Sequence, residues 1–202
     1  MAQHLLIASA TWKYKDSKDD RPILSEVLKD VVHLFTKKLG VYTRELLVIG
    51  ENPKASDLRA YLDQWFADPR RDPEDWIVFY YTGHAEIVGA DSLYLLTTDF
   101  VNGLHVSTAF NFMSFADIVL APSAHGRTRR VRNLLVILDT CFAGQGVTDV
   151  SSQLAVAFRR SSGGSFYLLG SALSRQEAQA EIDTEGRVLV FLVDGVRDEC
   201  LS

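Results

Sequence analysis

At the centre of the chain lies the run Trp76-Ile77-Val78-Phe79-Tyr80-Tyr81, in which every side chain is large and apolar or aromatic. A strand with apolar residues on both of its faces is typical of a parallel sheet that is covered on both sides. Two further runs share this character, Leu5-Leu6-Ile7-Ala8-Ser9 and Leu134-Leu135-Val136-Ile137-Leu138. We interpret all three runs as core strands of one buried sheet.

Segments with helical periodicity separate these strands. From Pro22 to Phe35 apolar residues recur at helical spacing, and Gly40 follows as a stop signal. A second helix is expected to begin at Ser56 and to end before Pro69. The remaining elements are expected as strands at residues 45–49, 93–96 (at a sheet edge) and 166–170, and as helices at residues 107–121, 150–160 and 187–199. This alternation predicts an α/β fold, with a mostly parallel central sheet and helices on both faces.

Length and composition narrow the possible functions. A chain of 202 residues can form one domain with a substantial core, and we expect residues 1–202 to form a single domain, either complete or part of a longer protein. The net charge of −5 argues against a nucleic-acid partner, and the basic residues between 127 and 132 are interpreted as a solvated loop. We find no apolar run of roughly 18 residues, as a membrane span needs, and no signal peptide.

The chain has only two cysteines, Cys141 and Cys200. Two cysteines make no disulfide framework, and the sequence has no Cys/His cluster of the kind that binds zinc. A reducing, cytoplasmic location is therefore expected. Asp16, Asp19 and Asp20 are interpreted as solvated rather than as a calcium site. We expect neither a metal nor a cofactor.

Residues that can carry chemistry follow two of the core strands. His84 is separated from the run 76–81 by Thr82 and Gly83. Cys141 is separated from the run 134–138 by Asp139 and Thr140. Ligands of open α/β sheets bind beyond the carboxyl ends of the strands. If these two strands are neighbours, they lie about 4.8 Å apart, and the imidazole and the thiol can share one reacting group. Either residue alone is more often structural than catalytic.

A thiol and an imidazole together are suited to nucleophilic catalysis. The thiolate is the reactive form of cysteine, and a nearby His can lower the thiol pKa or protonate the departing amine. Backbone amides can stabilise the oxyanion, and those of Ala85 and Cys141 are the candidates. Asp139 lies two residues before Cys141, where its carboxylate would attract a basic substrate side chain. The alternative for Asp139 is a strand-end carboxylate that caps local amides.

Two motifs resemble those of the caspase-like cysteine peptidases. The His motif of that family is similar to Tyr80-Tyr81-Thr82-Gly83-His84. Its Cys motif is similar to Leu138-Asp139-Thr140-Cys141-Phe142-Ala143-Gly144, and the closest group is the prokaryotic metacaspase-like branch, whose Cys motif begins with Asp. Residues 93–99 resemble the segment that follows the catalytic His, and the resemblance covers nearly the whole chain. It implies a caspase–haemoglobinase three-layer sandwich, a Cys141/His84 dyad, and cleavage after Arg or Lys with Asp139 lining the pocket for that residue.

The chain departs from the family pattern at several places, among them Phe142, where eukaryotic metacaspases often have His. Ala85 stands where the family has Gly after the His, which would be costly if the backbone there were left-handed. The second acid of the pocket is not clearly matched, because Gln176 falls near its place and Glu177 lies beside it. The chain ends where the family usually has another strand and helix. Prokaryotic relatives are often fused to sensor or repeat modules, so the resemblance implies a fused or associated regulatory module as a partner, beside protein or peptide substrates.

Self-cleavage is a further expectation from the resemblance. Arg159 and Arg160 precede a Ser/Gly-rich break between the Cys strand and the next strand, which suits an enzyme with basic preference. The alternative is an ordinary helix end, where basic residues interact favourably with the helix dipole.

Two other functions remain open from the sequence. One is a catalytically inactive caspase-like scaffold that binds partners; the presence of both His84 and Cys141 argues against it. The other is a nucleotide-binding signalling domain, which is disfavoured because Gly144-Gln145-Gly146 lacks the spaced Gly or Lys of a phosphate loop.

Overall fold

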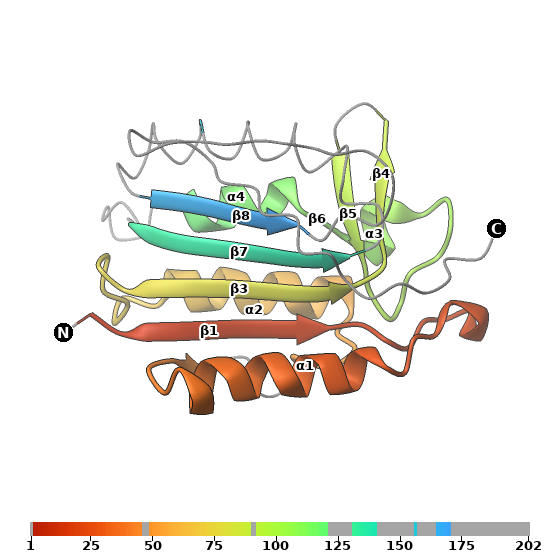
Figure 1. The fold of residues 1–202 in the computed structure, drawn as a ribbon. Helices are drawn as coiled ribbons and strands as arrows, with labels where there is room; N and C mark the ends of the chain where they lie inside the picture. Colours follow the sequence, from red (N-terminus) through yellow and green to blue (C-terminus); the bar gives the residue numbers. More distant parts are fainter. Residues whose placement is uncertain are drawn as a thin grey trace.

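Parallel strands form the centre of the computed structural model, which describes residues 2–45, 49–89, 92–120, 131–140, 156 and 165–170. In this part of the chain the main sheet has five strands, in the order β2-β1-β3-β7-β8. Figure 1 shows β1, β3, β7 and β8 side by side. The bounds of the five strands are β1 His4–Ala10, β2 Thr43–Arg44, β3 Trp76–Gly83, β7 Asn133–Thr140 and β8 Ser165–Gly170. Every pairing between them is parallel, which confirms the predicted α/β class.

Helices cover both faces of this sheet. Alternate residues of a strand point to opposite faces, so the apolar strands contribute to two separate cores. Helices α2 (Ala55–Ala67) and α4 (Met113–Leu120) pack on the face that carries Phe79 and Val136. Helix α1 (Leu24–His33) packs on the other face, which carries Val78 and Tyr80. The predicted three-layer arrangement is therefore confirmed.

The first two helices lie close to where the sequence predicts them. A 3₁₀ turn, η1 (Ser17–Asp19), precedes α1, and α1 continues into a π-helical turn, η2 (Leu34–Lys38). Gly40 follows with a φ of 69°, the left-handed conformation that a C-terminal stop requires. Helix α2 has no side-chain cap from Lys54; instead Oδ1 of the distant Asp99 accepts a hydrogen bond from the Ala55 N–H at 3.1 Å.

A second sheet corrects the prediction of an edge strand at residues 93–96. This sheet is antiparallel, with the order β4-β5-β6, and consists of β4 (Ala85–Val88), β5 (Ser92–Leu96) and β6 (Ala109–Asn111). Strand β5 is its central strand and does not belong to the main sheet. The cause is the chain reversal after β4, which pairs β4 with β5.

The single helix predicted for residues 107–121 is wrong. The chain forms the short helix α3 (His105–Thr108), then β6, then α4. Pairing of Phe110 with Leu95 holds the segment extended, and Oδ1 of Asn111 accepts the Met113 N–H at 2.9 Å, where α4 begins. A helix-like apolar spacing was therefore overridden by strand pairing and by a local Asn cap.

Other predicted elements are only partly covered. The strand expected at residues 45–49 is observed as β2 at Thr43–Arg44, and residues 46–48 lie outside the described part. Val156 is helical, as predicted for residues 150–160, whose other members also lie outside it. The helix expected at residues 187–199 is likewise outside the described residues, and the single-domain organisation of residues 1–202 stays a prediction.

Candidate functional site

The ends of β3 and β7 bring the two sequence motifs to one edge of the main sheet. The strands are parallel neighbours, with Thr82 opposite Asp139 and Gly83 opposite Thr140. This confirms that the two motif-bearing strands are adjacent. The next residue after β3 is His84, and the next after β7 is Cys141, which lies outside the described residues together with Glu177, Arg159 and Arg160.

The imidazole of His84 is held by the loop that follows β1. Its Nε2 lies 3.0 Å from the backbone carbonyl oxygen of Asp19. A carbonyl oxygen only accepts hydrogen bonds, so in this contact Nε2 carries the hydrogen and Nδ1 of the neutral ring is left as a proton acceptor. Burial lowers the pKa of His84, and the positive charge of Arg21 lowers it too, whereas the contact with Asp19 raises it. The net direction is downward, which favours the neutral ring.

The backbone of His84 is fixed on both sides of its Cα. Its N–H donates to the Tyr14 hydroxyl at 2.9 Å, and its carbonyl accepts from the Leu96 N–H at 2.9 Å. The Tyr14 ring also lies against the imidazole, with 5.0 Å between ring centroids. The position of His84 therefore depends on residues far from it in the sequence.

Gly83 is required by its surroundings. Its φ is 156°, and a Cβ built at this position would lie 2.8 Å from the Tyr81 hydroxyl oxygen and 3.1 Å from that of Tyr14. Any side chain would therefore collide with the two phenols that surround the His84 segment. The glycine of the His motif thus allows close packing at this turn.

Ala85 occupies an extended position, which answers the doubt raised by its replacement of glycine. It is the first residue of β4 and pairs with Leu95. Because Leu96 donates to His84, the 84–96 pair is of the hydrogen-bonded type, and the 85–95 pair is then of the other type. In such a pair the amide points away from the partner strand. The Ala85 N–H therefore faces the side of β4 opposite to β5.

Asp139 is half-buried on the face of the sheet that α1 covers. Its Oδ2 lies 3.2 Å from the hydroxyl of Tyr80, which donates to it from the neighbouring strand. Tyr80 is 3% exposed, and burial raises its pKa far above the ordinary value, with the charge of Asp139 adding to the effect. Tyr80 therefore remains a neutral donor. The partner found for Asp139 in the described chain is thus a side chain of another strand rather than a local amide.

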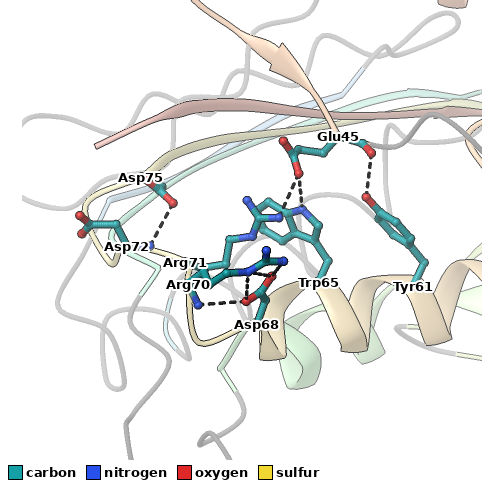
Figure 2. Close-up of polar contacts among 8 residues, drawn as sticks. All are labelled: Glu45, Tyr61, Trp65, Asp68, Arg70, Arg71, Asp72 and Asp75. Carbon is teal, nitrogen blue, oxygen red and sulfur yellow. Dashed lines mark hydrogen bonds and ion pairs between the residues drawn. The ribbon is translucent and has the colours of Figure 1, made fainter. Parts of the chain in front are cut away.

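A second polar cluster joins Glu45, which follows β2, to residues of α2 and of the segment before β3 (Figure 2). The Glu45 carboxylate accepts from Nε1 of Trp65 at 2.9 Å and from the Arg71 guanidinium at 3.0 Å. The guanidinium also stacks on the Trp65 ring at 4.1 Å, and Tyr61 donates to the Glu45 carbonyl. These contacts tie the segment after β2 to α2, and we interpret the cluster as structural.

Sequence reasoning did not identify Tyr14, Asp19 and Tyr80 as members of the candidate site around His84 and Asp139. Asp19 acts through its carbonyl, for which no side chain gives a signal. Tyr14 lies outside both sequence motifs, and its side chain is only 8% exposed. Among the described residues, no group of His, Cys, Asp and Glu side chains could hold a metal ion. The helices of the described part include none that could cross a membrane.

Comparison with known proteins agrees with this geometry. No curated protein sequence gives a significant match to the chain. The family model described as a caspase domain matches residues 9–192, a range that contains both β3 and β7 and both sequence motifs. Membership of that family implies a cysteine peptidase of the hydrolase class. The chain belongs to the caspase domain family.

Proposed function

We propose that this protein is a cysteine endopeptidase that cleaves after Arg or Lys, with Cys141 as nucleophile and His84 as its proton-transfer partner. The observation that carries the proposal is the register of β3 and β7, in which Gly83 lies opposite Thr140. His84 and Cys141 are the next residues of these paired strands. Neighbouring parallel strands that end together bring the residues after them into one region of space.

The hydrogen bond of His84 supports one path for the proton in the proposed reaction. Nε2 is occupied by the Asp19 carbonyl, so Nδ1 would accept the proton of the Cys141 thiol. The sulfur attacks the carbonyl carbon of the scissile peptide, and the imidazolium then returns the proton to the departing amine. The thioester that remains is hydrolysed by water, whose proton passes to His84 and then to the cysteine sulfur. The new carboxylic acid of the cleaved peptide is released, and the Cys141 thiol is restored.

The oxyanion of this reaction would be held by the amides of Ala85 and Cys141. The register of β4 and β5 supports this role for Ala85, because its N–H faces away from the ladder. An extended Ala85 also supports an active enzyme, because the replacement of the family's glycine imposes no left-handed backbone there.

The basic preference is assigned to Asp139, with Glu177 as a second acid of the pocket. Tyr80 supports this role for Asp139, because a neutral phenol leaves the carboxylate its negative charge while orienting it. Arg or Lys in the substrate would supply the opposite charge. The same preference underlies the proposed self-cleavage after Arg159 or Arg160. Membership of the metacaspase-like branch, a cytoplasmic location and a regulatory partner belong to the same proposal.

Hydrolysis of matched peptides that end in Arg, Lys or Asp before the scissile bond tests the proposal. The wild type, Cys141→Ala and His84→Ala are compared. Turnover of Arg and Lys peptides that is lost in both variants is the expected result. A preference for Asp would overturn the role of Asp139, and equal turnover by wild type and Cys141→Ala would remove the peptidase.

Self-cleavage needs its own measurement. Mass spectrometry of the purified wild type should show a break after residue 159 or 160, and Cys141→Ala should stay intact. A wild type that cuts Arg peptides but remains whole contradicts this part of the proposal alone.

A further inference from the structure

The junction between β3 and β4 departs from a regular ladder at one residue pair. In an antiparallel pair of the hydrogen-bonded type, each residue donates to the other. Leu96 does donate to His84, but His84 does not return the bond, because its N–H goes to the Tyr14 hydroxyl. The Leu96 carbonyl accepts from the Tyr81 hydroxyl instead, at 2.6 Å. The missing backbone hydrogen bond between His84 N–H and the Leu96 carbonyl is thus replaced by two bonds to phenol hydroxyls, those of Tyr14 and Tyr81.

The Tyr14 hydroxyl is itself held in place. It donates to the Thr11 carbonyl at 2.9 Å while it accepts from His84. Thr11 is anchored to β3, because its N–H donates to the Thr82 carbonyl at 3.0 Å and its Oγ1 lies 3.1 Å from the Tyr81 hydroxyl. The His84 amide is therefore linked through Tyr14 to the ends of both central strands.

The same loop holds the imidazole. Residues 11–21 are closed on themselves by bonds from the Tyr14 N–H to Asp20 and from the Arg21 N–H to the Trp12 carbonyl. Oδ1 of Asn52 accepts from the Trp12 and Lys13 amides and fixes the loop to the segment before α2. The Asp19 carbonyl that meets Nε2 of His84 is part of this closed unit. One loop thus holds both the ring and the backbone of His84. Asp19 of this loop contacts the ring, and Tyr14 contacts the backbone N–H.

We propose that Tyr14 is a positioning residue for the peptidase reaction, which acts through His84. By taking the His84 N–H, its hydroxyl sets the plane of the peptide that leads into Ala85 and the angle at which Nδ1 meets the thiol. This inference rests on the proposed function. A positioning role of this kind affects the rate of the chemical step rather than substrate binding.

Tyr14→Phe, compared with Tyr61→Phe, tests the inference. Both changes remove a phenol hydroxyl that donates to a backbone carbonyl, but Tyr61 lies in the cluster around Glu45 (Figure 2). We expect Tyr14→Phe to lower kcat for an Arg peptide roughly tenfold with KM nearly unchanged, and to shift the acid limb of the pH profile. Tyr61→Phe should leave kcat and the profile unchanged. Equal kcat and equal profiles for the two variants would overturn the role of Tyr14.

A measurement that does not need turnover separates this inference from the proposed function. In the Cys141→Ala background, the His84 imidazole is titrated by NMR with and without Tyr14→Phe. A loosened loop lets water reach the ring, so the pKa of His84 should rise toward its ordinary value of about 6.5, while Tyr61→Phe leaves it in place. An unmoved titration overturns the positioning role. A wild type that cleaves no peptide, with the titration shifted, contradicts the proposed function and leaves the positioning of His84 by Tyr14 supported.

Discussion

The Tyr80 hydroxyl donates to Oδ2 of Asp139 at 3.2 Å, across the junction of β3 and β7. Both residues lie on the face that α1 covers, next to the strand ends from which His84 and Cys141 continue. The carboxylate assigned to substrate recognition is therefore oriented from the strand that carries the His motif. The residues proposed for specificity and for catalysis thus lie on, or directly follow, one pair of strands.

Tyr80→Phe should weaken the recognition of basic substrates. The change keeps the ring in the core and removes the donor to Asp139, so the carboxylate is less well oriented. We expect KM for an Arg peptide to rise roughly three- to tenfold with kcat little changed. Tyr167→Phe, at a half-exposed tyrosine of β8, is the control. An unchanged KM in Tyr80→Phe would show that the phenol does not support binding.

The pH dependence of activity should follow the lowered pKa of His84. Burial is the main cause and the charge of Arg21 adds to it, whereas the hydrogen bond to Asp19 and the negative charges of Asp19 and Glu86 oppose it. Because the neutral ring must accept the thiol proton, the acid limb of kcat/KM is expected below pH 6.5, the ordinary value for His. A midpoint above 6.5 would contradict a buried neutral imidazole.

The lowered pKa of His84 should also make the free energy of unfolding depend on pH. The unfolded chain protonates His84 near pH 6.5 and the folded chain only at lower pH, so the unfolded state takes up the proton first. This contribution to stability is complete above pH 6.5 and is lost as the pH falls through the folded pKa. When urea unfolding is measured at pH 7.5 and at pH 5.5, the free energy of unfolding should therefore fall more between the two pH values for the wild type than for His84→Gln. Equal losses would count against the assignment.

The sequence was sufficient to predict the parallel sheet, because the strands of that sheet are buried on both faces. Residues such as Phe79 and Val136 leave no alternative to a covered sheet, and this also placed the His and Cys motifs at one edge. The small antiparallel sheet was not predictable in this way. Its formation depends on tertiary pairings of β5, and those outweigh the helical spacing of residues 107–121.

The supporting groups of the site were less predictable than the motif residues. His84 and Asp139 carry recognisable chemistry after apolar strands, whereas the Asp19 contact uses a backbone carbonyl. Tyr14 becomes relevant only when a loop folds back over β3. Local patterns report which residues can react, and long-range hydrogen bonds decide how they are held.

Asp99 should stabilise α2 although it lies beyond the end of β5. Its Oδ1 accepts from the Ala55 N–H at 3.1 Å and from the Thr97 hydroxyl at 2.9 Å, and so replaces the side-chain cap that Lys54 does not provide. Asp99→Ala is expected to cost about 1 kcal/mol in urea unfolding, and Asp99→Asn, which keeps an acceptor, less. Asp63→Ala, on the exposed side of the same helix, is the control. Equal effects of Asp99→Ala and Asp63→Ala would contradict the capping role.

The cluster around Glu45 should contribute to stability without contributing to activity. Glu45→Gln keeps an acceptor for Trp65 but removes the charge that pairs with the largely buried Arg71 (Figure 2). A loss of about 1 kcal/mol is expected, since partial exposure of both groups weakens the pair. Thermal or urea unfolding measures it, and peptide turnover should be unchanged. A fall in kcat would show that this cluster is coupled to His84.

Gly83→Ala is expected to be among the most damaging single changes in the chain. The new methyl group would lie 2.8 Å from the Tyr81 hydroxyl and 3.1 Å from that of Tyr14, and the φ of 156° is itself unfavourable for an L side chain. Both phenols are fixed by hydrogen bonds, so the chain must shift where His84 is positioned. We expect a loss of more than about 2 kcal/mol in unfolding free energy and the loss of peptide turnover.

Gly103→Ala separates the clash from the backbone strain. Gly103 has a φ of 81°, but a Cβ there meets nothing within 4 Å, so its replacement should cost only about 1 kcal/mol, from the left-handed conformation. In Gly83→Ala, the additional change Tyr81→Phe removes the closest contact and should restore part of the stability, while the contact with Tyr14 remains. If Gly83→Ala costs no more than Gly103→Ala, the packing of the two phenols around the turn into His84 is not as tight as this structure has it.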